Sequence, residues 1–152
     1  MKYLLFFATS LFLIMSSCGG QTENKNPIDP NYRDSLNKTK TFYPFDNWRK
    51  AFNDGLTQYT ESNCNQAKKI FDDLISELVK LGKEAKEADK ISLFKKAILK
   101  TNALNEKTDG ALIETGEAEQ LVELTNKIAI ACGIDPTKYG DGEGPASEWR
   151  EW

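Results

Sequence analysis

Hydrophobic residues recur at intervals of three and four positions through most of the chain, which is the period of an α-helix that buries one face. The first such stripe predicts a helix over about 47–61, capped by Asp46 or Asn47, and consists of Trp48, Phe52, Leu56 and Tyr59. A polar break at Ser62–Asn65 caps a second helix with the most regular stripe, namely Ala67, Phe71, Leu74, Leu78 and Leu81. The alternation of period two that is typical of strands does not extend over a useful length.

Two further helices complete the pattern. The second helix ends either at Gly82 or nearer Asp89, because the Ala, Glu and Lys residues between them favour helix. The third apolar face ends before the turn Thr108–Gly110 and consists of Ile91, Phe94, Ala97 or Ile98, and Leu104. Thr115 is expected to cap the last long helix, which ends at Gly133, and residues 146–152 form a short helix or turn.

These segments predict an all-α fold, a four-helix up-and-down bundle with a short C-terminal helix or turn. In this topology, Cys64 and Cys132 lie at opposite ends of the bundle, which excludes a disulfide because its Cα atoms must approach within about 7 Å. If residues 65–104 form one long helix instead, the two cysteines come to the same end. We expect two reduced, partly buried thiols.

The N-terminus has the pattern of a secretory signal. A basic start precedes the apolar run Leu4–Met15, which is too short to span a bilayer, since spanning needs roughly 20 residues. Small residues then precede Cys18, and the segment resembles the lipobox of bacterial lipoproteins, although Met15 stands where Leu, Val or Ile is usual. The resemblance implies removal of residues 1–17 and attachment to the membrane through acyl chains on Cys18. Gly19, in place of the aspartate that retains many lipoproteins at the inner membrane, favours the outer membrane of the cell envelope.

The remaining chain divides by composition into two parts. The polar residues 19–41 predict a lipidated tether with little structure over 18–41, followed by a helical domain over 42–152. A chain of 152 residues suits one domain with a single core.

The composition excludes several classes of function. A net charge of −3, spread along the chain, provides no clustered basic face for nucleic acid. The chain contains no histidine, so it lacks Ser-His and Cys-His nucleophiles and imidazole metal sites. We therefore expect no enzymatic activity, no cofactor, no metal and no nucleic-acid partner.

Two segments are candidates for an interface. The first is an acidic segment around the start of the last helix, with the candidate residues Glu114, Glu117, Glu119 and Glu123. Glu119 and Glu123 are one helical turn apart and present two carboxylates either to a cation, to a basic partner or simply to solvent. The second is the tail, with Trp149, Arg150 and Trp152. These residue types dominate interface hot spots, but two tryptophans on one helical turn can equally cover the bundle.

From Asn102 onward, the sequence resembles a family of small, uncharacterised bacterial helical domains, at Leu104–Glu106, Leu112–Glu117, Ala131–Gly133 and Ala146–Trp152. Families of this kind often contain immunity or inhibitor proteins. We expect a lipid-anchored, non-enzymatic helical domain that binds an unknown protein, as an inhibitor or immunity partner. The alternative is a bundle that binds a small molecule or lipid in a cavity lined by Phe42, Phe45, Trp48, Phe52 and Phe94.

Overall fold

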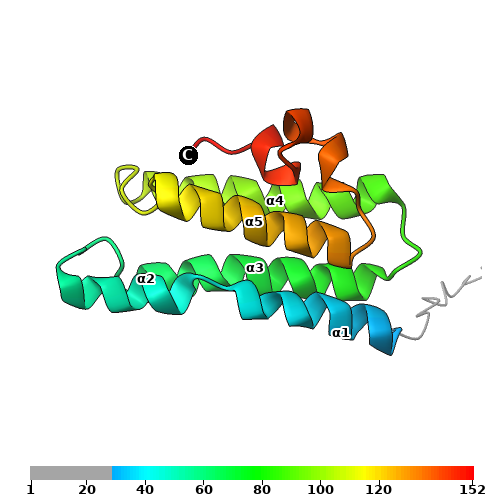
Figure 1. Cartoon of the computed structure of the whole chain (residues 1–152), viewed down its shortest axis with the longest axis horizontal. Helices are drawn as coiled ribbons and strands as arrows, with labels where there is room; N and C mark the ends of the chain where they lie inside the picture. The colour runs from blue at the N-terminus through cyan, green and yellow to red at the C-terminus, as the bar shows by residue number, and fades with distance from the viewer. Residues whose placement is uncertain (1–28) are drawn as a thin grey trace, which may run out of the picture.

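The computed structural model describes residues 29–152, and the regular elements of this part are all helices, without strands. Four antiparallel rods form an up-and-down bundle, which confirms the predicted all-α architecture; the first rod consists of two helices, α1 and α2, placed end to end (Figure 1). The α-helices are α1 (Pro30–Lys38), α2 (Phe45–Ala51), α3 (Glu61–Leu81), α4 (Glu87–Glu106) and α5 (Thr115–Ala131). Short 3₁₀ turns are η1 (Thr39–Phe42), η2 (Phe52–Asp54), η3 (Pro136–Lys138), η4 (Gly140–Gly142) and η5 (Pro145–Glu148).

The predicted signal peptide at 1–17, the lipidation of Cys18 and the first part of the tether lie outside the described residues. Among the described residues, no helix combines the length and the apolar character that crossing a membrane requires.

The helical domain already includes Asp29 and α1, so the prediction of a tether as far as residue 41 and of a domain that starts at 42 is wrong. The Asp29 carboxylate accepts a hydrogen bond from the Asn31 amide at 2.9 Å and caps α1, whose first residue is Pro30. Tyr32 and Leu36 are buried one turn apart. These two apolar residues are isolated in the sequence, yet four positions of spacing suffice to give a short helix a core-facing side.

The first predicted helix is in fact two elements, and its bounds at 47–61 are wrong. α2 begins at Phe45, after Pro44, so neither Asp46 nor Asn47 caps it. Its continuation η2 ends at Gly55, which has a φ of 96° that disfavours residues with a side chain. The stripe therefore breaks at its middle. Phe52 and Leu56 are exposed, whereas Trp48 is buried in α2 and Tyr59 in the loop that leads to α3.

The other helices start within one turn of the predicted positions. α3 begins at Glu61 because Thr60, not the Ser62–Asn65 segment, caps it, with the Asn63 amide 3.1 Å from the Thr60 hydroxyl. Gly82 ends α3 with a φ of 90°, which decides between the two predicted break points. Thr115 is the first residue of α5 and not its cap. Gly133 ends that helix as predicted, and the Ile134 amide donates to the Ala129 carbonyl at 2.8 Å.

The tail is a 3₁₀ turn followed by irregular chain. η5 ends at Glu148, and Trp149 has a φ of −138°. The two tryptophans therefore do not share one face of a helical turn, because the chain leaves the helical conformation between them.

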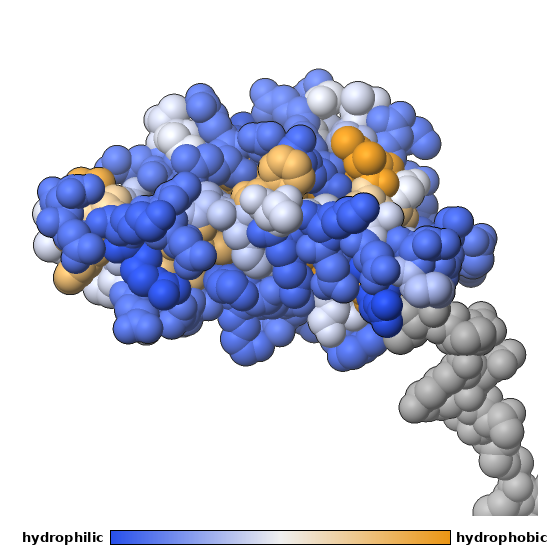
Figure 2. All heavy atoms as spheres, turned by 60° about the horizontal axis from the view of Figure 1, so that its bottom comes forward, coloured by the Kyte–Doolittle hydropathy of each residue, from blue (hydrophilic) through white to orange (hydrophobic). Residues whose placement is uncertain are grey.

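The core lies between the four rods and is filled by side chains, among which the largest fully buried are Phe45, Phe71 and Phe94. Phe45 packs edge-on against Trp48, with ring centroids 5.2 Å apart. Figure 2 shows one face of the molecule as largely hydrophilic, with hydrophobic residues in small, separate groups.

Both described cysteines are free, as predicted, and they are fully rather than partly buried. Helices α3 and α5 are parallel, which places Cys64 near the start of α3 and Cys132 at the end of α5, at opposite ends of the bundle (Figure 1).

Burial raises the pKa of Cys132 to about 11, so this thiol is expected to resist alkylation in the native protein. Relative to an ordinary thiol with a pKa of 9.0, the thiolate fraction at pH 8 falls about 100-fold. Alkylation of Cys132, followed by mass spectrometry with and without urea, measures this difference. Equal rates under both conditions would contradict the buried position.

Candidate functional site

Three of the predicted site residues line an open groove of about 530 Å³ along the outer side of α5, called here the α5 groove. Its lining consists of Glu119, Val122, Glu123, Asn126, Lys127, Ile130, Glu143 and Arg150. The first six recur every three or four residues of α5, on the side opposite the buried Leu121, Leu124 and Ile128. The groove therefore joins parts of the two predicted surfaces, since Glu119 and Glu123 come from the acidic segment and Arg150 from the tail.

The segment after α5 is fixed to this helix by Asn126. The Asn126 amide donates to the Glu143 carbonyl at 2.8 Å. Gly144 lies directly against the same side chain, and a Cβ at this position would come within 1.8 Å of the Asn126 Oδ1. Only glycine allows this close approach, so Gly144 determines where Glu143 borders the groove.

The tail is held on the bundle by Asn102 of α4, a buried side chain with two hydrogen bonds to tail backbone. Its amide nitrogen donates to the Trp149 carbonyl at 2.8 Å, and its oxygen accepts from the Glu151 amide at 3.3 Å. Trp149 and Trp152 are partly buried and pack against the core. Both tryptophans therefore cover the bundle, and of the three predicted tail residues only Arg150 lines the groove.

The charges in the α5 groove leave an excess of carboxylate. Glu123 pairs with Lys127 at 3.4 Å, and Arg150 pairs with Glu143 at 3.0 Å. Within residues 29–152, Glu119 forms no ion pair. An apolar surface accompanies these charges: Ile130 is 64% exposed, and Phe42, 49% exposed, lies with its ring centroid 4.5 Å from the Lys127 Nζ. The groove thus combines exposed apolar surface with net negative charge.

Glu114 and Glu117 do not take part in this groove. Glu117 lies beside Tyr59, where burial of the phenol and then its hydrogen bond to Glu117 raise the pKa of Tyr59 above its ordinary value. Glu114 is exposed just before α5 begins. The four predicted glutamates therefore belong to two separate places.

The described residues contain no group of three His, Cys, Asp or Glu side chains that could hold a metal ion. Glu119 and Glu123 consequently have no third protein ligand, and metal sites with oxygen ligands usually need more.

Asn126, Ile130 and Glu143 also line the groove, and the prediction missed them. Ile130 carries a signal in the sequence, because it is apolar but lies two residues after Ile128 and outside the buried stripe of α5. Glu143 has no such signal, since its position depends on the path of the loop after Gly133.

The five aromatic residues proposed to line an internal cavity do not do so together. Phe45, Trp48 and Phe94 are buried in the packed core, while Phe42 and Phe52 are exposed at different places on the surface. These five side chains therefore do not surround one cavity between the helices.

No protein-family model matches the sequence, and neither the search of curated proteins nor the search of solved structures finds a similar protein.

Proposed function

We propose that this chain is a lipid-anchored protein of the bacterial cell envelope whose helical domain binds another protein through the α5 groove, without enzymatic activity. The observation that carries the proposal is the exposure of Ile130, an isoleucine with 64% of its surface in contact with solvent inside a hollow bordered by charges. Apolar surface rimmed by polar groups is typical of protein interfaces.

The chemistry of the groove indicates the kind of partner. Three carboxylates and two cations line it, and Glu119 has no cationic partner among the described residues. A partner segment with an apolar side chain flanked by lysine or arginine would fill the hollow over Ile130 and pair with Glu119. Binding of this kind would serve an inhibitor or an immunity protein.

The membrane attachment in this proposal rests on the leader pattern of residues 1–17 and on Cys18. Gly19 supports the outer membrane as the location.

Replacement of Ile130 by aspartate is expected to reduce capture of the partner at least tenfold in a crosslinking pull-down from native envelope extract. The exposed position tolerates the change, whereas an added carboxylate in an apolar and already acidic contact opposes binding. Glu119→Lys should weaken the same capture through charge.

Glu114→Lys serves as the matched control, because it changes an exposed glutamate outside the groove by the same charge. Circular dichroism checks the folding of every variant. A protein captured equally well by the wild-type chain and by folded Ile130→Asp does not use this groove, and the proposal would then fail.

A further inference from the structure

A second surface of opposite charge lies on α4. Lys95, Lys96 and Lys100 are exposed on this helix, and Leu99, 45% exposed, lies between them. Lys95 and Leu99 are four residues apart, and so are Lys96 and Lys100. Residues at this spacing are neighbours on a helix surface, so the four form one continuous surface, called here the α4 lysine face. Together with Ser92 and Ala103, they line an open hollow of about 460 Å³.

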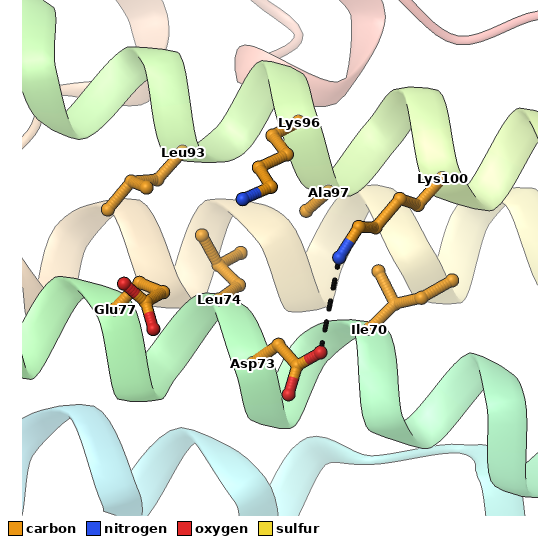
Figure 3. Close-up of a pocket in the computed structure, with 8 residues that line it drawn as sticks. All are labelled: Ile70, Asp73, Leu74, Glu77, Leu93, Lys96, Ala97 and Lys100. Carbon is orange, nitrogen blue, oxygen red and sulfur yellow. Dashed lines mark ion pairs between the residues drawn. The ribbon is translucent and has the colours of Figure 1, made fainter.

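The nearest carboxylates do not neutralise this surface. Figure 3 shows Lys96 and Lys100 extending from α4 toward α3, where Asp73 and Glu77 lie. Each of these acids has a closer partner on its own helix: Asp73 bonds Lys69 at 2.8 Å, and Glu77 bonds Lys80 at 2.7 Å.

The three lysines of the face thus keep most of their charge unpaired. Lys100 is 4.0 Å from Asp73, the outer limit of an ion pair. Lys95 and Lys96 have no ion-pair partner in the described part of the chain, and the Lys95 Nζ lies 5.8 Å from the ring centroid of Trp149. The α4 lysine face is therefore locally positive, although the whole chain has a net charge of −3.

The chain before Asp29 determines what this face can meet. At roughly 3.5 Å per residue, the segment from Cys18 to Asp29 reaches at most about 40 Å. A chain attached to a membrane at Cys18 keeps α4 within reach of the lipid headgroups. Lysines around one exposed leucine are also the composition of surfaces that lie at a membrane interface, with ammonium groups on phosphates and the apolar side chain toward the lipid.

We propose that the α4 lysine face rests on the anionic headgroups of the membrane to which the chain is attached. This inference uses the membrane attachment proposed above but not the α5 groove, with which the face shares no residue. Three lysines near an anionic surface favour this orientation about 100-fold at low ionic strength.

Amine labelling of the full chain in lipid vesicles tests the proposal. The protein is reconstituted into zwitterionic phosphatidylcholine vesicles and into vesicles that also contain phosphatidylglycerol, and brief acetylation is read at each lysine by mass spectrometry. In the anionic vesicles, we expect acetylation of Lys95, Lys96 and Lys100 to slow at least threefold. Lys38 and Lys50, which are exposed elsewhere, should react at the same rate in both. Salt at about 0.5 M should abolish the difference by screening.

Equal rates for the three lysines in both vesicles would overturn the proposal, and so would slowing that salt does not reverse. Slowing at Lys38 and Lys50 to the same extent would show general shielding and would overturn it as well. A chain that fails to float with zwitterionic vesicles contradicts the membrane anchor alone, because excess anionic vesicles still test the face. A triple variant, Lys95→Gln, Lys96→Gln and Lys100→Gln, should lose any extra binding to anionic vesicles, while Lys38→Gln with Lys50→Gln should keep it.

Discussion

Replacement of Lys90 by methionine is expected to lower the free energy of unfolding by about 2 kcal/mol. Lys90 is only 6% exposed, and its ammonium donates to the Lys83 carbonyl at 2.6 Å and to the Cys132 carbonyl at 2.8 Å. These carbonyls lie just after the ends of α3 and α5. Its Nζ is also 5.7 Å from the ring centroid of Tyr32 in α1, so one side chain of α4 connects all four rods.

Two opposing effects determine the size of this change. Methionine keeps the apolar length of the side chain but donates no hydrogen bond, and a buried carbonyl left without a donor, here that of Cys132, costs about 1–3 kcal/mol. The substitution also removes a buried ammonium that has no carboxylate partner. Because burial of a charge is unfavourable, this recovers part of the lost free energy of unfolding. We expect the loss of two short hydrogen bonds to dominate.

Urea unfolding measures the effect, and Lys95→Met is the matched control, since Lys95 is exposed on the same helix. The control should change stability by less than about 0.5 kcal/mol. A Lys90→Met protein as stable as the wild type would mean that desolvation of the ammonium outweighs its hydrogen bonds.

The substitution Gly144→Ala is expected to lower the free energy of unfolding by about 2–3 kcal/mol and to release the tail from α5. Two separate penalties contribute. Gly144 has a φ of 116°, which strains any residue with a side chain, and the new Cβ would lie 1.8 Å from the Asn126 Oδ1. Asn126 or the backbone must therefore move, and the Asn126 bond to Glu143 is then lost.

Gly142→Ala separates the two penalties. Gly142 has a φ of 96°, but the nearest atom to its Cβ, the Thr137 carbonyl oxygen, would be 4.0 Å away, so only backbone strain applies. Gly144→Ala should be clearly more destabilising than Gly142→Ala. Equal losses in urea unfolding would show that the contact with Asn126 yields easily and that the position of Glu143 does not depend on Gly144.

The helices that the sequence predicts best are those with long apolar stripes. α3, α4 and α5 each repeat the helical period over several turns. A segment with such a pattern can bury all its apolar residues on one side only as a helix. The packing of α1 on the domain depends on only two apolar residues, Tyr32 and Leu36. Their burial comes from contacts of α1 with α3 and α5, which a local pattern does not contain. Conversely, the apolar spacing from Trp48 to Tyr59 continues past Gly55 in the sequence, whereas the helical turn η2 ends before Gly55 in the structure.

The candidate site was predictable in its residue types but not in its assembly. Glu119 and Glu123 share a face of α5 by spacing alone. That Arg150 joins them, while Trp149 and Trp152 turn to the core, depends on Gly144 and Asn102, which direct the irregular chain after α5. Polar side chains that hold loops in this way follow no period, and the same holds for Lys90, which is charged but buried in α4.

The two cysteines at opposite ends of the bundle would have a consequence in the oxidising compartment in which we propose that this chain resides. In an unfolded chain, Cys64 and Cys132 can meet, and an oxidising compartment would join them into a bond that the folded bundle cannot contain. Helical bundles with mostly neighbouring contacts fold in roughly microseconds to milliseconds, whereas disulfides form in about seconds to hours. Folding is therefore faster than oxidation, and it buries both thiols before they can form a disulfide. A mutation that delays folding, even one far from either cysteine, would let oxidation trap the chain in a form that cannot reach the native state.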